Sequence, residues 1–143
     1  MTYCLLKKAD DADIPLILSV YKQPSLSRFI SIDEENYWKY ITDTDNVYFY
    51  KIYKDDILLA TIHLELDNCV LYMSVVVFPE YQKQGIATTI LKDIQTRKIG
   101  LDFDKIQVSI DEKNIASLKL FESVGFICVN KDEELLEYEY RKN

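Results

Sequence analysis

One segment of the chain combines residue types that suit phosphate binding. An apolar stretch at residues 69–78 leads into Gln-Lys-Gln-Gly-Ile-Ala at residues 82–87, where a helical pattern begins. The first turn of a helix has unpaired backbone N–H groups and a partial positive charge, so it attracts phosphate without cationic side chains. Gly85 and Ala87 would let a diphosphate approach the backbone closely, and Lys83 adds a point charge. The segment indicates a diphosphate site, although a glycine at such a junction is also ordinary turn chemistry.

Two other kinds of phosphate loop are excluded. Nucleoside triphosphate loops have a Gly-x-x-x-x-Gly-Lys-Ser/Thr run, and dinucleotide folds have Gly-x-Gly-x-x-Gly. The chain contains 3 glycines and neither run.

A second set of candidate residues lies in an expected strand at residues 57–66. Thr61, His63 and Glu65 alternate there with apolar residues. The two-residue period of a strand directs all three to one face. The pattern suits proton transfer by His63 and Glu65, and it also fits a solvated face or a histidine that makes only a local hydrogen bond.

Hydrophobic periodicity predicts the elements that must hold these residues. Strands are expected at residues 3–7, 47–54, 57–66, 69–78, 106–110, 126–129 and 135–140. Helices are expected to begin at residues 10–13, 31–33, 85 and 114 and to end near residues 21, 41, 98 and 125, with a loop at residues 23–31.

This order predicts a mixed α+β fold with about seven strands, four helices and helices on both faces of the sheet. A length of 143 residues and 48% hydrophobic content suit one domain over residues 1–143. Residues 47–78 form an antiparallel meander in this scheme. Its last strand, residues 69–78, has no charged residue, which favours a central strand covered on both faces.

Charge and hydropathy limit the partners. A net charge of −7 argues against nucleic-acid binding, which needs clustered Lys and Arg. The charge fits a cationic small substrate no worse than it fits plain solubility, which is the simpler interpretation. No stretch approaches the roughly 20 apolar residues that span a bilayer, and the N-terminus has no targeting pattern. We expect a cytoplasmic protein that does not bind membranes.

The cysteines and the histidine give no sign of a metal site. Cys4, Cys69 and Cys128 lie in apolar stretches, and an odd number cannot form a closed disulfide framework, so we expect buried free thiols in a reducing compartment. His63 is the single histidine, and no cysteine has a second cysteine or a spaced histidine nearby. We therefore expect no bound metal.

Two motifs give the chain a family resemblance. Residues 82–87, preceded by Val77-x-Pro79, resemble the Gln/Arg-x-x-Gly-x-Gly/Ala signature of the GNAT family of N-acetyltransferases. The family's later motif has a counterpart in Asn114-x-x-Ser117-x-x-Leu120-Phe121-x-x-x-Gly125-Phe126. The expected element order also resembles the family's fold over essentially the whole chain. The resemblance implies a mostly antiparallel sheet that is splayed between its fourth and fifth strands.

The resemblance also implies acetyl-CoA as co-substrate. In the family, the pantetheine arm pairs with backbone groups of the fourth strand, here Val75 and Val77 by position, and these polarise the thioester carbonyl. Asn114 would contact the cofactor as in the family and can cap a helix at the same time. The expected cofactor contacts are Val75, Val77, Gln82, Lys83, Gln84, Gly85, Ile86, Ala87, Thr88, Asn114 and Phe121.

The implied reaction is direct attack of a primary amine on the thioester. An ammonium with a pKa near 10.4 must lose a proton at neutral pH, which costs about 4 kcal/mol, whereas a departing thiolate costs about 1 to 2 kcal/mol. Base catalysis is the larger need. Glu65 and His63 are the candidate catalytic bases, and Asp111, beside the fifth strand, is a third possibility.

One residue departs from the family pattern. The usual acid for the departing thiol is a tyrosine seven residues after the motif's asparagine, and this chain has Phe121 there. A positioned acid contributes about 100-fold to 10,000-fold. Either water or another side chain protonates the sulfur, or the chain is a weak or inactive catalyst that serves as an acyl-CoA-binding sensor. We favour a working enzyme.

The acceptor is not specified by a fold resemblance. In this family the loop at residues 23–31 and the helix after it would form the acceptor wall, with Phe29, Tyr37 and Trp38 as candidate contacts. The expected partners are acetyl-CoA and an unidentified amine, and the expected assembly is a monomer or a homodimer.

Overall fold

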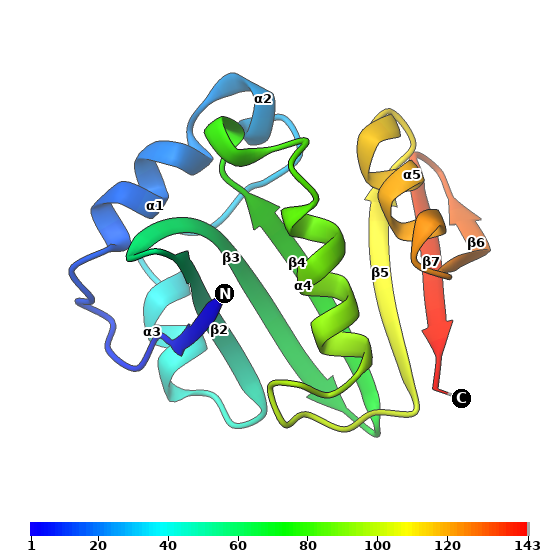
Figure 1. Ribbon diagram of the computed structural model, residues 1–143, viewed down its shortest axis with the longest axis horizontal. Coiled ribbons are helices and arrows are strands. Elements are labelled where there is room, and N and C mark those ends of the chain that lie inside the picture. Colours follow the sequence, from blue (N-terminus) through cyan, green and yellow to red (C-terminus); the bar gives the residue numbers. More distant parts are fainter. Residues whose placement is uncertain (143) are drawn as a thin grey trace.

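The computed structural model describes residues 1–142, which contain one seven-stranded sheet (Figure 1). The strands lie in the order β1-β2-β3-β4-β5-β7-β6. Their bounds are β1 Thr2–Leu5, β2 Val47–Lys54, β3 Ile57–Asp67, β4 Val70–Val77, β5 Lys105–Asp111, β6 Ile127–Asp132 and β7 Leu135–Arg141.

Neighbouring strands are antiparallel except for β4 and β5, which are parallel. A parallel neighbour needs a crossover connection, and α4 supplies it between these two strands. The mixed, mostly antiparallel sheet that the sequence predicts is confirmed.

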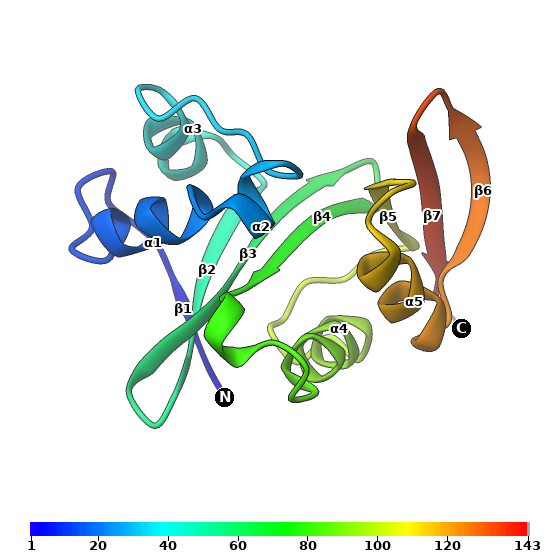
Figure 2. The same ribbon diagram turned by 90° about the horizontal axis from the view of Figure 1, so that it is seen from above.

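Helices cover both faces of the sheet (Figure 2). Two of them, α4 and α5, pack with the sheet in one hydrophobic cluster, and α1 and α3 pack on the opposite face in a second cluster. The helices are α1 Ile14–Tyr21, α2 Pro24–Ser27, α3 Tyr37–Asp43, α4 Ile86–Gln95 and α5 Ile115–Ser123, with a 3-10 turn at Pro79–Tyr81.

The structure has one α-helix more than the sequence predicts. The expected loop at residues 23–31 contains α2, because Pro24 sets the backbone angle of a first helical residue and Leu26 packs against the second cluster. The next helix, α3, begins later than residues 31–33. The Asp33 side chain accepts from the Glu35 N–H at 3.1 Å and from the Asn36 amide at 2.9 Å, which makes residues 33–36 a turn.

Two expectations about burial are wrong. The strand β4 is not covered on both faces along its length, since Tyr72 is 42% exposed and Ser74 is also exposed. Cys69 and Cys128 are exposed and Cys4 is half-buried. Cys69 lies in the turn before β4, and Cys128 lies on the edge strand β6, whose residues are all exposed.

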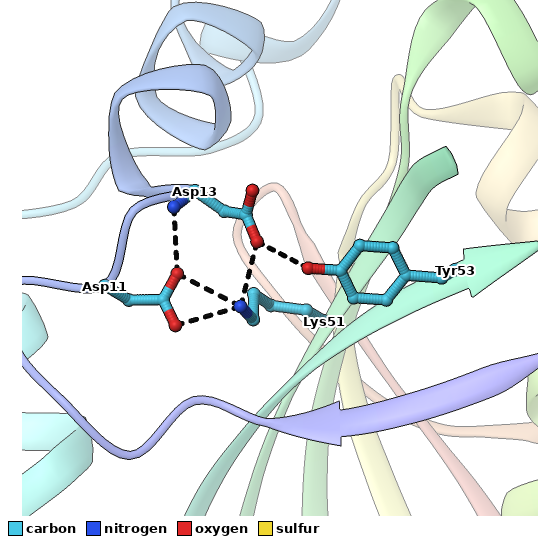
Figure 3. A network of polar contacts seen from close by, with 4 residues as sticks. All are labelled: Asp11, Asp13, Lys51 and Tyr53. Atoms are coloured by element: carbon cyan, nitrogen blue, oxygen red, sulfur yellow. Dashed lines mark hydrogen bonds and ion pairs between the residues drawn. The ribbon is translucent and has the colours of Figure 1, made fainter. Parts of the chain in front are cut away.

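A charged cluster ties the start of α1 to β2 (Figure 3). The Lys51 ammonium donates to Asp11 at 2.9 Å and to Asp13 at 2.8 Å, and the Tyr53 hydroxyl donates to Asp13. These hydrogen bonds, from Lys51 and then from Tyr53, hold the pKa of Asp13 below its ordinary value. The cluster fixes where α1 enters the face of the sheet that carries His63.

Candidate functional site

The parallel strands β4 and β5 separate after a short paired segment. Pairing covers Val70 to Tyr72 on β4 and Lys105 to Gln107 on β5. Beyond these residues β5 pairs only with β7 among the described strands. One edge of β4 is therefore left open from Met73 to its end, as the resemblance predicts.

The register of β4 shows which backbone groups face this opening. The Phe78 N–H donates to the carbonyl of Leu59 on the β3 side at 2.9 Å. Backbone direction alternates along a strand, so Val77, Val75 and Met73 direct their N–H and C=O groups away from β3 and toward β5. Val75 and Val77, which the resemblance implies as cofactor contacts, are among these residues. Met73 belongs to the same open edge, and the two-residue period could have identified it.

The loop after β4 presents free backbone N–H groups. Gly85 has φ 78° and Lys83 has φ 63°, so left-handed residues alternate with others in the loop. The first helical bond of this turn is Thr89 N–H to the Gly85 carbonyl, at 3.1 Å. Within residues 1–142, no hydrogen-bond acceptor serves the N–H groups of residues 83–88. Such a run of free N–H groups at a helix start is suited to binding an anion.

The side chains of this loop have different surroundings. Gln82, Lys83 and Gln84 are exposed, whereas Ile86 is buried in the core, so only its backbone faces the loop. Ala87 and Thr88 are half-buried. Gln82 donates from Nε2 to the Val77 carbonyl at 3.0 Å, which ties the loop to the end of β4.

The later motif lies on α5. Asn114 caps the helix, with Oδ1 accepting from the Ser117 N–H at 3.3 Å. Phe121 is 5% exposed and meets Phe126 edge to face at 5.0 Å between ring centroids. Its ring therefore fills the core, and no phenol is available at this position.

The candidate bases form a continuous hydrogen-bonded chain with α3. Tyr37 Oη lies 2.6 Å from His63 Nδ1, and His63 Nε2 lies 2.7 Å from Glu65 Oε2. Tyr40 donates to Glu65 Oε1 at 2.8 Å. The register sets His63 opposite Ser74 and Glu65 opposite Tyr72 of β4. This hydrogen-bonded network therefore lies beside the strand that opens toward β5.

The sequence misses part of this arrangement. Tyr37 is expected as an acceptor contact, and its hydrogen bond to the histidine is not predicted, while Tyr40 is not singled out at all. The signal was present, because tyrosines three residues apart on a helix share a face.

Other candidates occupy structural positions. Thr61 is buried, and its hydroxyl lies 2.5 Å from that of Tyr21. Trp38 is 5% exposed and packs against Phe49, so its ring is a core residue and not an acceptor wall. Asp111 accepts from the Lys113 N–H at 2.8 Å in the turn after β5. The Arg28 guanidinium lies over the Phe29 ring, with its central carbon 4.9 Å from the ring centroid.

Burial controls the ionisation of the tyrosines in this region. It raises the pKa of Tyr21, and it raises that of Tyr37, where the nearby Tyr21 and Glu65 add to the effect. A hydrogen bond to Glu65 raises the pKa of Tyr40. All three phenols therefore keep their protons at neutral pH and can donate.

Two structural features are not found among residues 1–142. No three His, Cys, Asp or Glu side chains converge in this range as metal ligands would. No helix in it has the length and apolar character needed to cross a membrane.

A family model for GNAT acetyltransferases matches residues 16–126, which include both motifs and the hydrogen-bonded network around His63. The chain belongs to the acetyltransferase (GNAT) family. Comparison with curated proteins finds no sequence match.

Three solved structures are similar in fold to this chain. The dodecameric spermidine N-acetyltransferase from Vibrio cholerae is 17% identical with a TM-score of 0.77, covering 99% of this chain and 93% of that one. The N-acetyltransferase PseH from Campylobacter jejuni, solved with acetyl coenzyme A, is 12% identical with a TM-score of 0.78, covering 99% and 100%. A domain from Methanocaldococcus jannaschii is 19% identical with a TM-score of 0.76, covering 98% of each chain. At these identities the similarity establishes the GNAT fold.

Proposed function

We propose that this GNAT protein is an acetyl-CoA-dependent N-acetyltransferase that moves the acetyl group to a primary amine by direct attack. One observation carries the proposal. The open edge of β4 leads directly into the loop of free N–H groups at residues 83–88. A strand edge can pair with the amides of a pantetheine arm, and the loop can hold a pyrophosphate at the next position along the same ligand.

The cofactor side needs little from side chains. Met73, Val75 and Val77 offer backbone N–H and C=O groups to the arm, and the Val77 carbonyl, which accepts from Gln82, keeps a second lone pair. A backbone N–H aimed at the thioester oxygen would stabilise the negative charge that develops there. In the PseH structure an acetyl coenzyme A is bound on the same fold, which supports this choice of co-substrate.

The acceptor side supplies the base. The arriving ammonium gives one proton to Glu65, and the neutral nitrogen attacks the thioester carbon. The N–C bond forms, the C–S bond breaks, and the second nitrogen proton passes to the sulfur, directly or through water. The sum is one amide, one thiol and one proton, which Glu65 returns to solvent.

A second candidate function is acyl-CoA binding without turnover, and Phe121 is the observation that favours it. No hydroxyl at this position can protonate the departing sulfur. A thiolate is nevertheless a fair leaving group near neutral pH, at a cost of about 1 to 2 kcal/mol. We therefore keep the enzyme as the first proposal.

Calorimetry with acetyl-CoA and a thiol-release assay with a panel of primary amines test the two functions. Spermidine belongs in the panel, because one structural neighbour is a spermidine N-acetyltransferase. Binding with thiol release supports the enzyme, and binding without release from any amine supports the sensor. No binding at millimolar acetyl-CoA contradicts both.

The base is tested by Glu65→Gln and His63→Ala. Loss of general base catalysis lowers kcat about 100-fold or more and changes the dependence of the rate on pH. Asp102→Asn is the control, since this carboxylate lies in the loop between α4 and β5 and pairs with Arg97 at 2.7 Å. Unchanged pH profiles in both site variants would contradict this assignment.

A further inference from the structure

The helix α3 brings two hydroxyls to the candidate base. Trp38 and Ile41 of this helix are buried in the second cluster, which fixes its rotation about its own axis. Tyr37 and Tyr40 lie on the adjacent face, three residues apart, and both reach residues of β3. The helix is therefore held by its apolar side while its polar side contacts the site.

With His63 neutral, the protons of this hydrogen-bonded network have one consistent arrangement. A carboxylate only accepts, so His63 Nε2 carries a proton and donates to Glu65. A neutral imidazole has a single N–H, so Nδ1 has a lone pair and must accept. Tyr37 is the donor to it, at 2.6 Å, and burial keeps this phenol protonated.

The ring of Tyr37 is itself held in place. It meets Trp38 edge to face at 5.0 Å and Phe49 at 6.1 Å between ring centroids. Phe49 lies on β2 directly opposite His63, so the phenol and the imidazole share one aromatic wall. The hydroxyl is thus aimed by packing on two sides.

We propose that Tyr37 is a positioning residue that fixes the orientation and the Nε2–H tautomer of His63 for the acetyl transfer proposed above. An imidazole held by a donor at Nδ1 and an acceptor at Nε2 cannot turn over without breaking both bonds. The purpose of this positioning rests on the proposed function, whereas the hydrogen bonds of His63 do not depend on that function.

The tautomer decides which group takes the acceptor's proton. Both nitrogens of neutral His63 are engaged, one by Tyr37 and one by Glu65. Each oxygen of Glu65 receives one donor, His63 at Oε2 and Tyr40 at Oε1, which leaves each with a free lone pair. The proton therefore goes to Glu65, and His63 orients that carboxylate.

The single histidine makes the tautomer directly observable. Because His63 is the chain's one histidine, a nitrogen-15 spectrum of the imidazoles shows one ring. At a pH of about 8.5, above the usual titration range of histidine, we expect a protonated Nε2 and an unprotonated Nδ1 that accepts a hydrogen bond. A protonated Nδ1, or two tautomers in comparable amounts, overturns the proposal.

The variant Tyr37→Phe keeps the ring and removes the hydroxyl. We expect the Nδ1 resonance to move to the position of a nitrogen without a hydrogen bond, and kcat to fall about 10-fold to 100-fold with KM for acetyl-CoA unchanged. An unmoved Nδ1 resonance in this variant overturns the proposal.

Tyr53→Phe is the matched control, because it loses the hydrogen bond to Asp13 in the cluster of Figure 3. It should leave both the His63 spectrum and kcat unchanged, and a moved Nδ1 resonance in this control overturns a specific role for Tyr37. The spectrum needs no turnover. A protein that acetylates nothing but shows the expected spectrum contradicts the proposed function and leaves the positioning role intact.

Discussion

The side-chain amide of Gln82 donates a 3.0 Å hydrogen bond to the carbonyl of Val77, the last residue of β4. This bond joins the open strand edge to the loop of free N–H groups, which are the two halves of the proposed cofactor site. The Val77 carbonyl keeps a second lone pair, so Met73, Val75 and Val77 all remain acceptors on that edge.

Gln82→Leu should therefore weaken acetyl-CoA binding. Losing one hydrogen bond of about 1 kcal/mol that holds the loop corresponds to about a 5-fold rise in Kd, measured by calorimetry. Gln95→Leu is the matched control, since Gln95 donates to the Val124 carbonyl at 2.8 Å, away from the loop. If the control weakens binding equally, the bond to Val77 has no special role.

Gly85→Ala should strain the loop without a steric clash. A β-carbon at Gly85 would meet no atom within 4 Å, yet φ is 78°, which disfavours any residue but glycine by about 1 to 2 kcal/mol. Gly100 has the same open surroundings at φ 86° and serves as control. Both alanine variants should lose about the same free energy of unfolding in urea. A weaker acetyl-CoA affinity is expected for Gly85→Ala alone, and equal affinities in the two variants would contradict the loop assignment.

Phe121→Tyr should raise turnover by less than about 10-fold, because the thiolate leaves without a dedicated acid. A gain of about 100-fold would instead show that the missing acid limits the rate. The added hydroxyl enters a buried position beside Phe126, so the free energy of unfolding should also fall by about 1 to 3 kcal/mol. Phe126→Tyr is the control for that loss, with no expected gain in thiol release.

Lys51→Met should lower the free energy of unfolding by about 2 kcal/mol at pH 7. This value lies between those of exposed and buried ion pairs, because the Lys51 pairs are partly buried. Lys51 holds the pKa of Asp13 below its ordinary value. A depressed carboxyl pKa gives stability that is present above the unfolded pKa near 4 and is lost as pH falls through the folded pKa.

The difference between wild type and Lys51→Met should therefore shrink below about pH 4 in urea titrations. Lys98→Met removes a long ion pair, 3.6 Å, between the exposed Lys98 ammonium and the partly buried Asp93, and should change stability by about 0.5 kcal/mol or less. A difference for Lys51→Met that stays constant from pH 7 to pH 3 would show that the ion pair is not its source.

Much of the fold follows from local patterns. The alternation around His63 identifies a strand, and the apolar strand followed by a glycine loop identifies the junction before α4. The short helix α2 was missed, because four residues are too few for a periodic pattern and Pro24 also fits a loop. The exposure of Cys69 and Cys128 was missed since it depends on which strand lies at an edge.

By itself the sequence determined that His63 and Glu65 share a face and that a helix begins near Gly85, because both are properties of backbone periods within one segment. Only the tertiary structure decided that Tyr37 and Tyr40 bond this pair. Their separation along the chain, 26 and 25 residues, is bridged by the docking of α3 on the sheet, which no local period encodes. The same holds for the gap beside β4, which exists because β5 turns toward β7 and leaves backbone groups unpaired.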